Sequence, residues 1–123
     1  MQKITFLVLL FHGSKRESAF SEAASMVAET GRGLPPSRVF PAFLQFVSPS
    51  LPDTLQTCLN QGASHVKVYP MFVLSGSHVE SDIPAMVESW RKKHPGVEVE
   101  LLPHLGIDPS FRQWLHGTLQ GQL

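Results

Sequence analysis

The sequence predicts an α/β fold: one open, parallel four-stranded sheet of strand order 2-1-3-4, with helices on both faces. Two observations predict it. Four short apolar segments alternate along the chain with four segments whose apolar residues recur at helical spacing. A strand that follows a helix in this way pairs in parallel through a right-handed crossover. The first segment, residues 4–11, is also apolar throughout, as in a strand buried on both faces of a sheet.

The first half of the chain supplies two strands and one helix. Residues 4–11 form the expected first strand, and residues 17–30 carry the apolar spacing of the first helix. After a turn at Pro35-Pro36, residues 38–47 predict the second strand. Because proline cannot donate to a neighbouring strand, Pro41 favours an edge position for it.

The second half continues the alternation. It predicts a helix over residues 50–61, a strand over 65–74, a helix from Ser81 or Asp82 to about Lys93, a strand over 97–102 and a last helix over 109–119. The resulting order 2-1-3-4 is the four-strand version of a flavodoxin-like arrangement. Seven phenylalanines inside or beside these elements are expected in the core, namely Phe6, Phe11, Phe20, Phe40, Phe43, Phe46 and Phe72.

Composition limits the classes of function. The 123 residues, with 42% hydrophobic and 16% charged side chains, fit one globular domain spanning 1–123 rather than a disordered chain. Lys plus Arg balance Asp plus Glu at ten each, which argues against a nucleic-acid or anionic-membrane partner. The apolar run at 4–11 is too short to span a bilayer. A single cysteine, Cys58, cannot form an internal disulfide, and we expect a reducing, cytoplasmic location.

Two histidines follow neighbouring strands at the expected binding edge. Ligands of such sheets bind at the carboxyl ends of the strands, where the strand order reverses. Here that point lies between the first and third strands, which deliver His12 and His78. Imidazole ligates metals and transfers protons near neutral pH, so this pair is the candidate catalytic and metal-binding centre.

The loops around the pair are built from small residues. They leave the backbone accessible to a large flat or anionic ligand, and the candidate substrate-binding residues are Gly13, Ser14, Ser75, Gly76 and Ser77. Lys15 and Arg16 stand at the rim, where they can contact carboxylates or phosphates. The sequence has no glycine-rich phosphate motif after the first strand, so no nucleotide cofactor is expected.

The other histidines are weaker candidates. His104 also follows a strand, the fourth, and is a candidate third ligand. We expect His65 at the opposite end of the sheet, His94 near a helix C-terminus and His116 on the surface of the last helix.

These residues resemble a known family. The sequence resembles the small CbiX-type class II tetrapyrrole chelatases along nearly the whole chain, in Phe11-His12-Gly13-Ser14, Phe43-Leu44-Gln45, Pro49-Ser50-Leu51, Gly76-Ser77-His78 with Asp82-Ile83-Pro84, and Pro103 to Pro109. The resemblance implies a lyase that inserts a divalent metal, Co²⁺ first and Fe²⁺ or Ni²⁺ otherwise, into sirohydrochlorin. That octacarboxylate tetrapyrrole lies on the routes to cobalamin and sirohaem. His12 and His78 match the family's catalytic, metal-binding histidines.

The resemblance also implies a partner and reveals a departure. The chain looks like one half of a duplicated chelatase, so a homodimer is expected, with Phe72, Val73 and Leu74 as candidate contacts. Gln45 and Ser48 stand where family members often have acidic residues, which casts doubt on a mechanism that uses a carboxylate at these positions. A non-catalytic carrier of metal or tetrapyrrole is therefore the alternative function.

Overall fold

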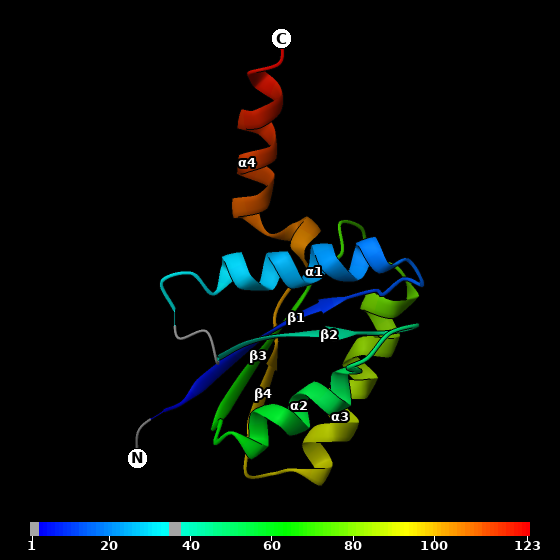
Figure 1. Ribbon diagram of the computed structural model, residues 1–123, viewed down its shortest axis with the longest axis vertical. Helices are drawn as coiled ribbons and strands as arrows, with labels where there is room; N and C mark the ends of the chain where they lie inside the picture. Colours follow the sequence, from blue (N-terminus) through cyan, green and yellow to red (C-terminus); the bar gives the residue numbers. More distant parts are fainter. Residues whose placement is uncertain (1–2, 35–37) are drawn as a thin grey trace.

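The computed structural model describes residues 3–34 and 38–123. Its elements are β1 (Thr5–Phe11), α1 (Glu17–Thr30), β2 (Val39–Phe43), α2 (Leu51–Asn60), β3 (His65–Pro70), α3 (Ile83–Lys93), β4 (Glu98–Leu101) and α4 (Pro109–Gln120). The strands pair in parallel in the order β2-β1-β3-β4, which confirms the predicted topology. Figure 1 shows α1 on one face of the sheet and α2 with α3 on the other. The predicted turn at Pro35-Pro36 lies outside the described residues.

The main core lies between the sheet and the pair α2 and α3. Strand β3 alternates along its length, with Val66, Val68 and Pro70 buried and the residues between them half-buried. The fully buried side chains are mostly aliphatic: Val8, Leu10, Leu51, Leu55, Val66, Val68, Ile83 and Val87. Cys58 belongs to the same cluster, and burial raises the pKa of its thiol to about 12, so this cysteine is a packing residue.

The second and third strands are shorter than the sequence predicts, because the chain turns away into loops at their carboxyl ends. β2 ends at Phe43 instead of residue 47, although the next two residues still donate backbone hydrogen bonds to the end of β1. β3 ends at Pro70 instead of residue 74, after which the Met71 amide makes one last bond to the Leu10 carbonyl. Pro41 does lie in an edge strand, as predicted.

Two of the seven phenylalanines are not core residues. Phe20 is 42% exposed and Phe46 is 57% exposed. Phe20 lies on α1, which buries a single residue, Ala23, so most of this helix faces outward. Phe46 lies in the loop beyond β2. The prediction failed for them because apolar character alone does not show whether a helix face or a loop is covered by the rest of the fold.

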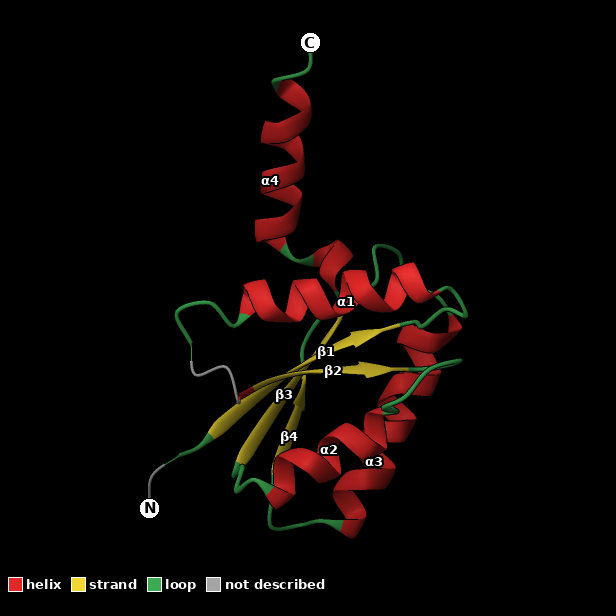
Figure 2. Ribbon diagram, viewed as in Figure 1, coloured by secondary structure: helices red, strands yellow, loops and turns green. Residues whose placement is uncertain are grey.

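Helix α4 projects from the rest of the protein, as Figures 1 and 2 show, and none of its residues is buried. Its start is tied down by Asp108, which accepts hydrogen bonds from the Ser110 amide and from the Tyr69 hydroxyl of β3. These bonds lower the pKa of Asp108, while burial and Asp108 together raise the pKa of Tyr69 to about 12. None of the helices in the described residues is long and apolar enough to cross a membrane.

The turn that leads into α4 predicts a sharp difference between two glycines. A Cβ on Gly106 would lie 1.5 Å from the carbonyl oxygen of Val73, whereas a Cβ on Gly117 would meet nothing within 4 Å. We expect Gly106→Ala to lower the free energy of unfolding by at least about 2 kcal/mol, because backbone must move. Gly117→Ala should instead raise it by up to about 1 kcal/mol, since alanine favours the helix. Urea unfolding of both variants checks this, and equal effects would contradict the packing.

Candidate functional site

The structure brings His12 and His78 together at the carboxyl ends of the strands. Their ring centroids lie 5.2 Å apart, with the ring planes at 67°. His12 directly follows β1 and is exposed, and the half-buried His78 lies beyond β3. The sequence predicted that two neighbouring strands would deliver these histidines to the same edge of the sheet, and the structure places the two rings side by side there.

The sequence predicted His78 in a loop, and this prediction was wrong. His78 begins a π-helical turn, His78–Asp82, that runs directly into α3. The prediction began the helix at Ser81 or Asp82, where Pro84 would fall in its first turn. The wider turn extends the helix because the Ile83 amide bonds back to the carbonyl of His78. Such turns are frequent at functional sites.

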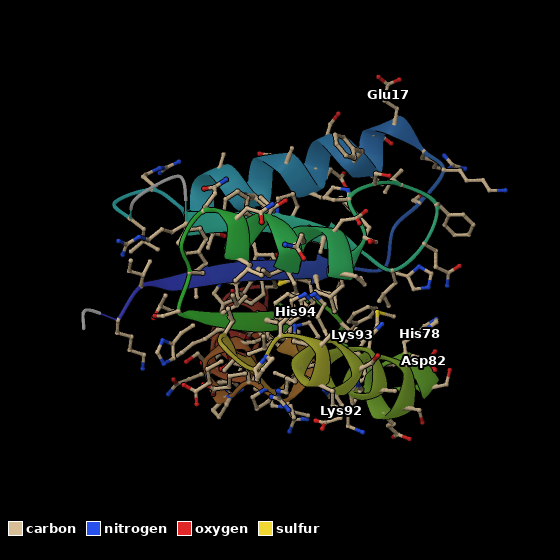
Figure 3. All side chains as sticks on the ribbon, turned by 90° about the horizontal axis from the view of Figure 1, so that it is seen from below. Glu17, His78, Asp82, Lys92, Lys93 and His94 are labelled. Atoms are coloured by element: carbon tan, nitrogen blue, oxygen red, sulfur yellow. The ribbon has the colours of Figure 1, made fainter. Side chains whose placement is uncertain are left out.

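Both imidazoles are oriented through their Nδ1 atoms. His78 Nδ1 lies 2.9 Å from a carboxylate oxygen of Asp82, and Figure 3 shows these two side chains together at the start of the helix. His12 Nδ1 lies 3.2 Å from the carbonyl oxygen of Gly13. Because both partners are acceptors, each Nδ1 carries the hydrogen and each Nε2 presents its lone pair as an acceptor. This is the arrangement in which histidines bind metals, with a carboxylate or carbonyl holding the outer nitrogen.

Gln45 joins the two rings. Its Nε2 lies 3.3 Å from His12 Nε2 and 3.4 Å from His78 Nε2, so one amide group donates to both lone pairs. The two histidine nitrogens therefore point at one shared position. A carboxylate in place of this amide would add a negative charge there, which Gln45 does not supply.

Backbone contacts hold Gln45 in this place. The backbone N–H of Gln45 donates to the carbonyl of His12 over 3.0 Å. This bond ties the loop after β2 to the loop after β1. Gly13 has φ +100°, and a Cβ there would lie 2.0 Å from the carbonyl oxygen of Gln45. Glycine is thus required at this position both by its backbone conformation and by the close approach of the neighbouring loop.

The other small residues lie in the two segments that carry His12 and His78. The Ser14 hydroxyl accepts a hydrogen bond from the Arg16 amide at the start of α1. Ser75, Gly76 and Ser77 are exposed in the segment that leads to His78, and the Gly76 carbonyl accepts from the Glu80 amide. These segments leave the His pair open to solvent on one side.

His104 does not join the pair. It is buried, at 6% exposure, and it lines a hollow with Val79 and Ile83 on the side of α3. Across residues 3–34 and 38–123, no three His, Cys, Asp or Glu side chains come together as a metal site. The prediction of a third ligand was therefore wrong, because a position after a strand does not decide whether a side chain turns into the core.

The remaining histidines lie where the sequence predicted. His65 is at the amino end of β3 and pairs with Glu98 at 2.7 Å. His94 stacks on Trp90 at the end of α3, with ring centroids 3.9 Å apart, and His116 is exposed on α4.

A hollow of about 630 Å³ lies at the amino ends of the strands, beside His65, Arg91 and Glu98. Ser64, His65 and Glu98 form a hydrogen-bonded chain there. The Ser64 hydroxyl, however, also bonds both backbone groups of Ile4, at 2.8 and 3.1 Å. This serine closes the end of the sheet, so the chain is structural and no nucleophilic site results.

The sequence predicts no positioning role for two residues that hold the pair. Asp82 is there a possible helix start and part of the family motif, although its i, i+4 spacing from His78 is the spacing at which helical side chains meet. Gln45 departs from the family pattern, but no residue pattern near it in the sequence indicates that its side chain lies between the two imidazole rings. It lies 33 residues from each histidine, so only the folded chain shows the contact.

The fold and the pair define a class: an α/β protein that presents two Nε2 atoms, suited to a divalent metal, at the switch point of its sheet. The chain belongs to the CbiX family, whose family model matches residues 6–121.

Individual relatives agree with this assignment. The chain is 31% identical to the chloroplastic sirohydrochlorin ferrochelatase of Arabidopsis thaliana over 81% of its own length and 44% of that protein. A CbiX protein of cobalamin biosynthesis from Marinobacter aquaeolei VT8 shares the fold with a TM-score of 0.77, 25% identity and 96% coverage of both chains. The sirohydrochlorin chelatase SirB of Bacillus subtilis subspecies spizizenii, solved with cobalt, aligns at a TM-score of 0.81 and 22% identity.

Length separates the chain from several relatives. Its alignment with SirB includes 96% of this chain but only 50% of the SirB chain. It likewise spans 36%, 37% and 44% of three curated relatives.

The contact between the two loops predicts the behaviour of Gly13→Ala. This change adds both the cost of a positive φ and a clash with the Gln45 carbonyl, so it should destabilise the protein more than Gly62→Ala. Gly62 has φ +92° and open space around it, so its variant pays only the backbone cost of about 1–2 kcal/mol. Urea unfolding compares the two, and imidazole NMR signals of His12 and His78 should shift in the Gly13 variant alone. Unchanged signals there would contradict the coupling of the loops.

Proposed function

We propose that residues 1–123 act as one chelatase unit that inserts a divalent metal into sirohydrochlorin. The observation that carries the proposal is the paired Nε2 atoms of His12 and His78, which face one position while their Nδ1 atoms are held by acceptors. Membership of the CbiX family and the likeness to a sirohydrochlorin ferrochelatase supply the substrate class.

The chemistry follows from imidazole. A free dication holds its water tightly, and replacing water by an Nε2 lone pair holds a partly dehydrated metal close to the macrocycle. Two pyrrole N–H protons must leave as the metal–nitrogen bonds form: one imidazole can accept the first, and the second leaves to solvent water. Gly13, Ser14, Ser75, Gly76 and Ser77 are the proposed contacts of the ring. The step exchanges one dication for two protons, so its atoms and charges balance without a nucleotide.

We propose Co²⁺ as the metal substrate, with Fe²⁺ and Ni²⁺ as alternatives. The likeness to a CbiX protein of cobalamin biosynthesis supports cobalt, and the likeness to a ferrochelatase supports iron. Two nitrogen ligands suit all three ions.

We also propose a cytoplasmic location for the protein. The free, buried thiol of Cys58 is compatible with this reducing compartment.

The central test separates a chelatase from a carrier. Gln45 gives the carrier its support, since a neutral amide stands between the histidines. Purified protein is mixed with sirohydrochlorin and Co²⁺, and the absorbance of the macrocycle is followed against a reaction without protein. Faster insertion supports the chelatase, whereas binding without faster insertion supports the carrier.

The histidine pair predicts a specific pattern of variants. His12→Ala and His78→Ala should each lower the insertion rate at least tenfold, or about 1.4 kcal/mol of barrier, with the fold intact by circular dichroism. The exposed His116 and the distant His65 are matched controls, and their alanine variants should keep nearly the full rate. A His12→Ala protein as active as the original would remove this histidine from the mechanism.

We also propose that the unit works as a two-fold homodimer. The length of SirB, about twice that of this chain, supports two such units per enzyme. Exposed apolar residues lie after β3, before α4 and on α4, and we take them together as a candidate contact, the apolar band: Val73, Leu74, Ile107, Trp114, Leu115 and Leu119, all at least 38% exposed. Exposed apolar side chains of this kind are what homodimer interfaces bury, with aromatic residues among the main anchors.

The dimer predicts the effect of a charge on this band. Trp114→Glu should shift the protein from dimer to monomer in sedimentation at micromolar concentration, because α4 would carry a buried charge at the contact. His116→Glu, on the same helix but outside the apolar band, is the control and should remain dimeric. A monomeric original protein that inserts metal at full rate would contradict the proposal.

A further inference from the structure

Phe46 combines two features that do not stabilise a fold. Its side chain is 57% exposed, and its backbone has φ 72°, which bulky residues rarely adopt. The Val47 amide bonds to the Gln45 carbonyl over 2.9 Å, so Phe46 is the central residue of a strained three-residue turn. Glycine or asparagine adopts such a φ at lower cost.

The loop around Phe46 is held at both sides. Gln45 is bonded to the His12 carbonyl, and the Phe43 amide donates to the Pro49 carbonyl over 2.9 Å. The aromatic ring is thus presented by a fixed backbone beside the residue that joins the two histidines. Strained residues held in this way gather at ligand sites.

A cation accompanies the ring. The Nζ of Lys15 lies 5.3 Å from the centroid of the Phe46 ring, and the Lys15 side chain is exposed. Across the described residues, no salt bridge engages this ammonium. A flat apolar surface and a free positive charge therefore stand together, next to the His pair.

We propose that Phe46 and Lys15 form a substrate-binding element for a flat, polycarboxylate macrocycle, a step that rests on the proposed function. The ring of Phe46 stacks on one pyrrole face, and the Lys15 ammonium pairs with a carboxylate at the edge of the same macrocycle. The strain at Phe46 is retained because the ring must project beside Gln45. This element orients the macrocycle over the histidines.

The test measures binding of metal-free sirohydrochlorin by its fluorescence. Phe46→Asn removes the ring and suits the positive φ, so it should weaken binding at least tenfold without lowering the melting temperature. Phe46→Trp keeps an aromatic face and should bind within about threefold of the original protein. Lys15→Ala should weaken binding at low salt and lose most of that effect at high salt. Lys93→Ala, an exposed lysine at the far end of α3 from His78, is the control and should bind normally.

The outcomes separate this inference from the proposed function. Cobalt binding without macrocycle, followed by its visible absorbance, should be unchanged in Phe46→Asn because the histidines remain. If Phe46→Asn binds sirohydrochlorin as tightly as the original, or if Phe46→Trp is as weak as Phe46→Asn, the stacking role is wrong although metal insertion can still proceed. If the original protein neither binds nor metallates sirohydrochlorin, the proposed function fails and the inference fails with it.

Discussion

The hydrogen bond from the backbone N–H of Gln45 to the His12 carbonyl is the contact on which the rest of the site depends. It joins the loops that leave two adjacent strands, and the missing side chain of Gly13 lets them approach. Through it, the Gln45 side chain reaches both Nε2 atoms and the turn at Phe46 is held in place. A parallel sheet makes this economical, because neighbouring strands end at the same edge and deliver their loops side by side.

The site separates orientation from chemistry. Asp82 and the Gly13 carbonyl hold the outer nitrogens of the imidazoles, so the inner nitrogens need no further ordering when a metal arrives. In the structure, the uncharged side-chain amide of Gln45 donates to the Nε2 lone pairs of both histidines. In the chelatase proposed above, a dication would displace hydrogen bonds to a neutral amide and not a charge pair. The neutral amide would then favour a metal that is handed on over one that is held permanently.

The two faces of the sheet are unequal. The face under α2 and α3 is aliphatic and closed. On the other face α1 buries only Ala23, and the exposed side of β3 and β4 carries the His65–Glu98 pair. Helix α4 finds no apolar surface to pack on there and projects with its apolar side chains in solvent. The exposed apolar side chains of α4 are the surface that the proposed homodimer would cover.

The sequence alone determined the alternation of strands and helices, the strand order and the convergence of His12 and His78, because periodicity, chirality and the switch-point rule are properties of local pattern and topology. It also separated His65, His94 and His116 from the site. The tertiary structure alone decided that His104 turns into the core, that Gln45 bridges the rings and that Phe46 is exposed on a strained turn. Each of these depends on where a side chain points after its strand has ended. That direction is set by contacts between loops about 30 residues apart, which leave no periodic trace in the sequence.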